Sequence, residues 1–140
     1  MPPKNLVFIL LISLGLISTA QAKVVSGKEP ALCAMSEVYE CVVVSGCEQV
    51  APQEVGLLTS FLTIDFKKRE IRAKGTEQVT VADKLFEVGD KLVLAGAEAT
   101  DWVEDRAVGY SLTVTRASGE MVLSSAGDDV AFVVFGNCTN

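Results

Sequence analysis

Four cysteines are the residues whose chemistry the sequence specifies most clearly: Cys33, Cys41, Cys47 and Cys138. An even number of cysteines in an exported chain predicts two disulfides, for which three connectivities exist. Seven residues separate the first two cysteines and five separate the next two, which is not the spacing of a zinc knuckle, and the chain contains no histidine. We therefore expect structural disulfides and no metal site.

A second candidate site is the acidic segment around the single tryptophan. Asp101, Glu104 and Asp105 flank Trp102 within a predicted loop over 96–107. Carboxylates of this kind can ligate Ca²⁺, and a tryptophan can stack on a sugar ring. The spacing lacks the Asp-x-Asp-x-Asp-Gly frame of a calcium loop. We interpret the segment as a solvated acidic loop whose tryptophan covers one end of the core, and we keep it as a candidate binding loop.

Catalytic motifs are missing from the sequence. Without histidine, Ser-His-Asp and Cys-His arrangements are excluded. The glycines are isolated turn residues and form no phosphate-binding loop, and no pair of acids has the defined separation that glycoside hydrolysis needs. The sequence therefore predicts a non-enzymatic protein with no cofactor.

The N-terminus has the pattern of an export signal. Lys4 precedes an apolar run over 6–17, and Ala20-Gln21-Ala22 forms a small-x-small cleavage site. The apolar run is shorter than the roughly 20 residues that a permanent membrane helix needs. We expect a signal peptide over 1–22, cleavage near Ala22, and a periplasmic or secreted mature chain with no stable membrane anchor.

The mature chain has the size of one domain and a negative charge. Removal of 22 residues from 140 leaves 118, enough for a single core. Lys4 leaves with the signal, so 11 basic residues remain against 18 acidic ones and the formal net charge is −7. This charge argues against nucleic acid and anionic lipid as partners, since both are also negative.

Alternating patterns predict strands along most of the mature chain. Apolar residues occupy every second position over 61–66 and 108–114, and Gly89-Asp90 suits a hairpin turn. The segment 130–135 is apolar at odd and at even positions, so we expect a strand that is covered on both faces. No long segment has convincing helical periodicity.

The predicted fold is all-β. We expect a flexible arm over 23–30 and a single β domain over 31–140, built as an antiparallel meander of about eight strands. Such a meander forms a small closed or partly open barrel, and a two-sheet β-sandwich is the alternative.

Barrel closure would place the last strand beside the first and bring Cys138 near the other cysteines. We therefore favour Cys33 or Cys41 as the partner of Cys138, with Cys47 in the remaining pair. A disulfide that closes a loop of ~100 residues contributes roughly 4–5 kcal/mol in the chain-entropy model.

Several segments together resemble a group of small exported proteins from Gram-negative bacteria that have no assigned function. The resemblance lies in the stretches 61–66, 109–114, 119–121 and 131–138, and in the Glu40-Cys41 and Gly46-Cys47 dipeptides. It covers most of the mature chain and implies a periplasmic location. It supplies no catalytic or binding residues.

Three functional classes fit these features. The first is a non-enzymatic binding or interaction module for a protein or small ligand of the cell envelope. The second is a small periplasmic inhibitor of a lysozyme or protease, suggested by fold analogy. The third is a carrier of a small apolar ligand, although bulky inward residues such as Leu62, Ile64 and Phe66 leave little room inside an eight-stranded barrel.

Overall fold

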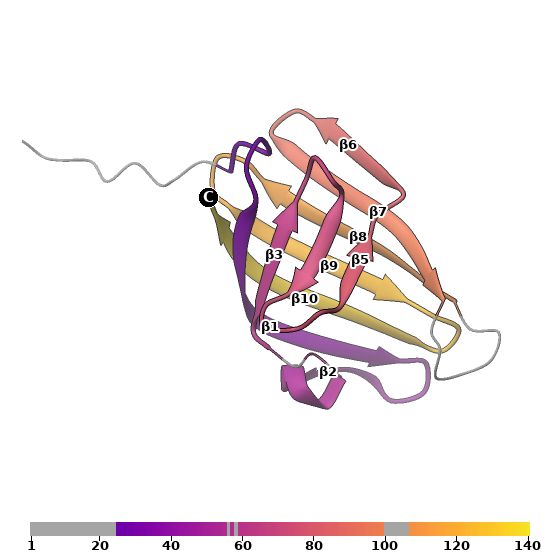
Figure 1. Cartoon of the computed structure of the whole chain (residues 1–140). Coiled ribbons are helices and arrows are strands. Elements are labelled where there is room, and N and C mark those ends of the chain that lie inside the picture. The colour runs from indigo at the N-terminus through magenta and orange to yellow at the C-terminus, as the bar shows by residue number, and fades with distance from the viewer. Residues whose placement is uncertain (1–24, 56, 58, 100–106) are drawn as a thin grey trace, which may run out of the picture.

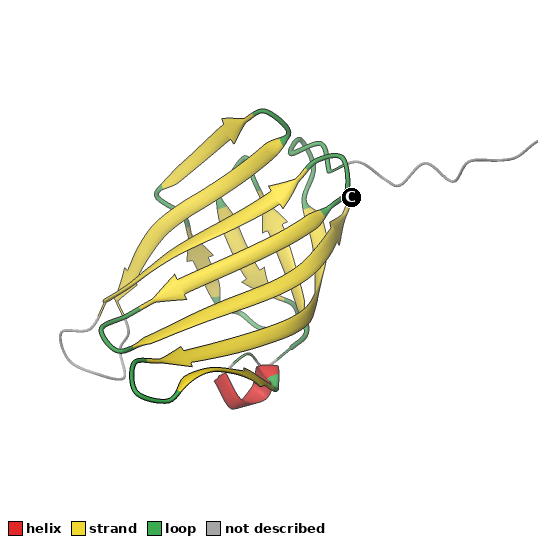
Figure 2. Ribbon diagram, turned by 180° about the vertical axis from the view of Figure 1, so that it is seen from behind, coloured by secondary structure: helices red, strands yellow, loops and turns green. Residues whose placement is uncertain are grey.

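The computed structural model describes residues 25–55, 57, 59–99 and 107–140. The predicted signal peptide and the acidic residues Asp101, Trp102, Glu104 and Asp105 lie outside this part of the chain. The described residues form an all-β fold, an antiparallel sheet curled into a half-barrel (Figures 1 and 2). The strands are β1 (Ala31–Val42), β2 (Gly46–Val50), β3 (Phe61–Asp65), β4 (Glu70–Ala73), β5 (Val79–Val81), β6 (Lys84–Val88), β7 (Lys91–Ala99), β8 (Ala107–Thr115), β9 (Glu120–Ala126) and β10 (Val130–Thr139), and a 3₁₀ turn, η1 (Pro52–Val55), follows β2.

The strand order confirms the predicted meander. Nine strands follow the path β5-β4-β3-β1-β10-β9-β8-β7-β6, and β2 pairs with β1 off this path. All pairs are antiparallel, and the last strand lies beside the first, as expected. The single curled sheet corresponds to the partly open barrel, not to the sandwich. The described residues contain ten strands instead of about eight, partly because Gly46–Val50 folds back onto β1 as a separate strand.

The two edges of the sheet meet at a seam without a strand ladder. Strands β5 and β6 are the edges, and Ala82 and Asp83 connect them. The Ala82 N–H donates to the Arg69 carbonyl over 2.8 Å and continues the β4–β5 ladder, and the Ala97 N–H donates to the Asp83 carboxylate over 3.2 Å at the end of the β6–β7 ladder. A side-chain contact between Thr80 on β5 and Glu98 on β7 bridges the open side of the half-barrel.

Large apolar side chains fill one end of the half-barrel. The register aligns Leu92 with Val114 and Met121 across β7, β8 and β9, and all three side chains are buried. Strand β3 faces them from the opposite wall with Ile64, also fully buried. The alternating segments 61–66 and 108–114 thus turn the predicted faces inward, with Ile64, Phe66, Leu112 and Val114 buried in the core.

The segment predicted as a flexible arm is anchored where the structure describes it. Val25 is fully buried, and its N–H donates to the Arg116 carbonyl over 3.0 Å. The Asn140 side chain accepts a hydrogen bond from the Ser26 N–H over 2.8 Å. Residues 25 and 26 of this segment thus contact the packed end of the barrel, where the Val25 side chain is buried and the Asn140 side-chain amide bonds to the Ser26 backbone.

Strand β10 is covered on one face only, which corrects the prediction for 130–135. Val134 is 2% exposed, whereas Phe135 is 41% exposed on the outer face. The Phe135 ring packs edge-on against Tyr39, with ring centroids 6.1 Å apart. Among the described residues, no second layer covers the convex side of the curled sheet (Figure 2). Apolar side chains that point outward from it therefore stay partly in solvent.

Both disulfides follow the favoured pairing. Cys33 and Cys138 are register partners that join β1 to β10, with 105 residues of sequence separation. Cys41 and Cys47 are register partners in the β1–β2 hairpin, with a separation of 6. One disulfide joins the two ends of the domain, and the other fastens a local hairpin.

These separations predict unequal contributions to stability. The chain-entropy model gives about 5 kcal/mol for the Cys33–Cys138 loop and about 2 kcal/mol for the Cys41–Cys47 loop. We expect the Cys33→Ala/Cys138→Ala variant to lose clearly more free energy of unfolding than the Cys41→Ala/Cys47→Ala variant. Urea denaturation at equilibrium measures both losses. Equal losses would contradict the assignment of the first disulfide as the closure of the domain.

Candidate ligand-binding cavity

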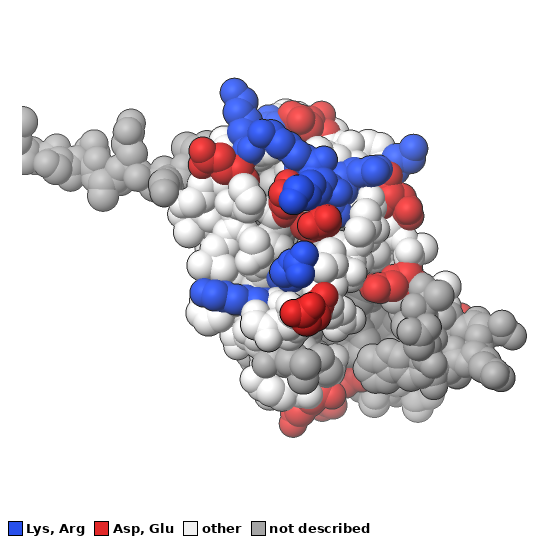
Figure 3. Space-filling model, viewed as in Figure 1, with Lys and Arg blue, Asp and Glu red and all other residues white. Residues whose placement is uncertain are grey.

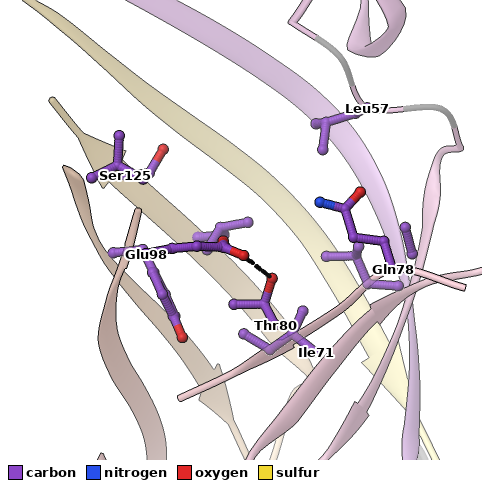
Figure 4. A pocket seen from close by; sticks show the side chains of 11 residues that line it. Leu57, Ile71, Gln78, Thr80, Glu98 and Ser125 are labelled. Atoms are coloured by element: carbon purple, nitrogen blue, oxygen red, sulfur yellow. Dashed lines mark hydrogen bonds between the residues drawn. The ribbon is translucent and has the colours of Figure 1, made fainter. Parts of the chain in front are cut away.

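A cavity of about 230 Å³ lies inside the half-barrel, at the end opposite to Val25 (Figure 4). Strands β3, β4 and β5 form one wall, and β7, β8 and β9 form the other. The apolar lining residues are Leu57, Leu62, Ile71, Ala73, Val108 and Leu123. The polar lining residues are Gln78, Thr80, Glu98, Tyr110 and Ser125.

The cavity forms where the inward residues become smaller or polar. Along β7 the inward positions are Leu92, Leu94, Gly96 and Glu98, so two large apolar side chains are followed by a glycine and a carboxylate. Strand β9 changes in the same direction and presents Ser125 beyond its apolar inward residues. Successive rows of inward residues along the sheet therefore change from a packed core to an open cavity.

Glu98 places a carboxylate on the cavity wall. The Thr80 hydroxyl donates to it, with Oγ1 lying 3.3 and 3.4 Å from the two carboxylate oxygens (Figure 4). This contact runs from the edge strand β5 to β7, the strand next to the other edge, so it bridges the open side of the sheet. In the described part of the chain, Glu98 is the only charged residue among those that line the cavity. The site therefore has a negative group opposite a largely apolar wall.

Tyr110 lies across Gly96, its register partner on β7. A Cβ atom at position 96 would lie 2.7 Å from the tyrosine Oη, so glycine is needed for the ring to fit. The hydroxyl oxygen is buried and forms no hydrogen bond within the described part of the chain. Burial raises the pKa of Tyr110 above its ordinary value of 10, and the charges of Glu98 and Asp83 raise it further. The hydroxyl thus remains a hydrogen-bond donor at neutral pH.

These groups can recognise a small molecule. Ligand sites combine an apolar lining with a few convergent polar groups that fix orientation. Here one carboxylate, three hydroxyls and one amide surround the apolar wall. Within residues 25–55, 57, 59–99 and 107–140, no group of three cysteine, aspartate or glutamate residues is arranged to hold a metal ion.

The structure brings together residues that the sequence analysis did not single out. The four cysteines form the two disulfides and do not line the cavity. The predicted binding loop of Asp101, Trp102, Glu104 and Asp105 lies outside the described residues. A loop beginning at Gly96 was the wrong prediction, since β7 continues to Ala99. The sequence signal for the site was that Gly96 and Glu98 follow Leu92 and Leu94 at every second position. All four residues therefore point to the same inward face of β7.

Charged residues on the face in Figure 3 form a mixed surface. Basic side chains gather over the upper part of this face, with acidic side chains between them. Lys68 lies 3.9 Å from Asp65, and Arg72 lies 3.9 Å from Glu70. Such exposed pairs contribute little to stability and leave no uniform basic patch for an anionic partner. None of the described residues belongs to a helix long and apolar enough to cross a membrane.

The environment of Tyr110 predicts a measurable titration. In a Tyr39→Phe background, which leaves one of the two tyrosines, phenolate absorbance should report a pKa above 10. Glu98→Gln removes a charge that disfavours the phenolate, so the pKa should move down toward 10. Glu48→Gln, an exposed substitution on β2, serves as the control. An unchanged titration in Glu98→Gln would contradict the proximity of this carboxylate to Tyr110.

Comparisons with known proteins identify no relative of this chain. No protein-family model matches it, and neither a curated protein nor a solved structure is significantly similar. Functional inference therefore depends on the residues and the geometry of the cavity.

Proposed function

We propose that this protein is an exported, non-enzymatic binding protein that holds a small ligand inside its half-barrel. The observation that carries the proposal is the cavity of about 230 Å³, in which an apolar wall faces the Glu98–Thr80 pair and the buried Tyr110 hydroxyl. An apolar cavity with a few convergent polar groups is the usual form of a small-molecule site.

The volume limits the size of the ligand. Pockets for drug-sized molecules occupy roughly 300–1,000 Å³, whereas a cavity of about 150 Å³ is enough for benzene. A space of about 230 Å³ thus suits one ring or a short branched chain with a polar substituent. Of the bulky inward residues that argued against a carrier, Ile64, Phe66 and Leu112 are buried and do not line the cavity, whereas Leu62 and Tyr110 form part of its wall.

The proposed location is the periplasm or the extracellular space. Two disulfides are typical of proteins that fold in an oxidising compartment. The basic start, apolar run and Ala20-Gln21-Ala22 site support export through a signal peptide over 1–22. A small ligand of the cell envelope or of the surrounding medium is accessible in either place.

Filling the cavity should abolish binding. Ala73 lines the cavity, so Ala73→Leu occupies ligand space, whereas Ala34→Leu adds the same atoms on the exposed outer face of β1. We expect ring-sized probes such as phenol, benzyl alcohol and cyclohexanol to bind the wild-type protein. Calorimetry should show an affinity loss of about tenfold or more in Ala73→Leu and little change in Ala34→Leu. Failure of every probe to bind, or equal losses in both variants, would refute the proposal.

A second candidate function, inhibition of a hydrolase, is favoured by the tip of the β1–β2 hairpin. Val43 and Val44 are 80% and 95% exposed, and the Cys41–Cys47 disulfide closes the hairpin behind them. The Val43 N–H donates to the Asp129 carbonyl over 3.3 Å, which ties the tip to the β9–β10 turn. A pre-organised loop with exposed apolar side chains fits an enzyme cleft at low entropic cost.

Valine at this tip suits a small apolar specificity pocket of the elastase type. If the hairpin is inhibitory, the protein should slow hydrolysis by an elastase, and Val44→Asp should abolish this effect. Val122→Asp places the same charge on the outer face of β9, so this variant should retain the inhibition. Unchanged rates for elastase and for lysozyme at high concentrations of the protein would remove this candidate.

A further inference from the structure

We infer that the cavity selects a small organic cation, a ring-sized amine, with its ammonium group on the Glu98 carboxylate and its apolar body against Leu62, Ile71 and Leu123. This inference rests on the proposed function and names the chemical class of the ligand. The carboxylate and the apolar residues line the same cavity: Leu62 and Ile71 lie on β3 and β4, across from Glu98 on β7, and Leu123 lies on β9.

The Glu98 carboxylate retains acceptor positions that a ligand can use. Its one hydrogen-bonding contact among the described residues is with the Thr80 hydroxyl, and none of their ion pairs involves Glu98. A carboxylate has about four acceptor positions, so most of them remain for a ligand. An ammonium group offers three donors and the opposite charge, and charge-assisted hydrogen bonds are about twice as strong as neutral ones.

The charge on the cavity wall has one sign among the described residues. Those that line the cavity include the Glu98 carboxylate and no lysine or arginine. Asp83 lies nearby, where its carboxylate accepts a hydrogen bond from the Ala97 N–H and the Arg69 guanidinium donates to its carbonyl oxygen, so the charges of these two side chains offset each other. A partly apolar wall with Glu98 as its charged group attracts cations and repels carboxylates and phosphates.

The rest of the cavity wall is largely apolar. Leu62, Ile71 and Leu123 offer apolar surface that a fully hydroxylated ligand such as a sugar would leave poorly matched. An inorganic cation would need several oxygen ligands, whereas Glu98 is the only carboxylate among the described residues of the cavity wall. A molecule with one cationic end and one apolar end matches both parts of the cavity.

Three probes of nearly equal shape test this inference in the exported protein: benzylamine, benzyl alcohol and benzoate. We expect calorimetry to show that benzylamine binds about tenfold or more tightly than benzyl alcohol, and that benzoate binds least. Glu98→Gln should remove the preference for the amine while leaving the affinity for benzyl alcohol nearly unchanged. Glu48→Gln, an exposed substitution with the same change in net charge, should behave as the wild type.

The outcomes separate this inference from the proposed function. Equal affinity of the wild type for benzylamine and benzyl alcohol, or an amine preference that persists in Glu98→Gln, overturns the cation site and leaves a neutral ligand site. Absence of binding by all three probes overturns the proposed function and the inference with it. Unchanged binding of benzyl alcohol shows that Glu98→Gln is folded, and Glu98→Asp should keep a preference for the amine.

Discussion

The pairing of β1 with β10 is the constraint on which the rest of the structure depends. It joins the wall made by β3, β4 and β5 to the wall made by β6 through β9, so the two apolar faces lie opposite each other (Figure 1). Without this ladder, each wall would expose its apolar face to water. The Cys33–Cys138 disulfide fastens the ladder between residues that are register partners.

Because the sheet is curled, the inward side chains of neighbouring strands lie in successive layers along the half-barrel. Every second residue points inward, so each row of register partners forms one level of the interior. The levels at the Val25 end consist of large apolar side chains and hold the fold together. The levels at the other end contain Gly96, Glu98 and Ser125, which contribute little to an apolar core. Residues that break the core pattern without a gain in packing are typical of functional sites.

Much of the fold could be predicted from local patterns, because alternation within one strand is a local property. The inward faces of 61–66 and 108–114 are confirmed, and Cys138 pairs with Cys33, one of the two partners that were favoured. The burial of Val25 and the exposure of Phe135 could not be predicted in this way. Both depend on what lies across the barrel or over its outer face, which the residues of one segment do not specify.

The candidate site was missed for a related reason. Gly96 and Glu98 have residue types that are common in turns, and a loop was therefore expected where β7 continues. Glycine at position 96 is explained only by Tyr110 on the neighbouring strand, whose hydroxyl occupies the space of a side chain. The Glu98–Thr80 contact depends on the closeness of β5 and β7, two strands that are distant in the strand order. Cavities arise from such non-local alignments.

Methyl NMR during titration with benzylamine tests the central claim most directly, because it reports where a ligand sits. Leu62, Ile71 and Leu123 line the cavity, whereas Leu92, Val114 and Met121 form a buried row in the packed half and provide an internal reference. If the half-barrel holds a small ligand at its open end, the methyl signals of the first three residues shift in a saturable way and those of the reference residues stay nearly constant. Saturable shifts confined to the packed half or to the outer face, or no shifts at all, would contradict the account.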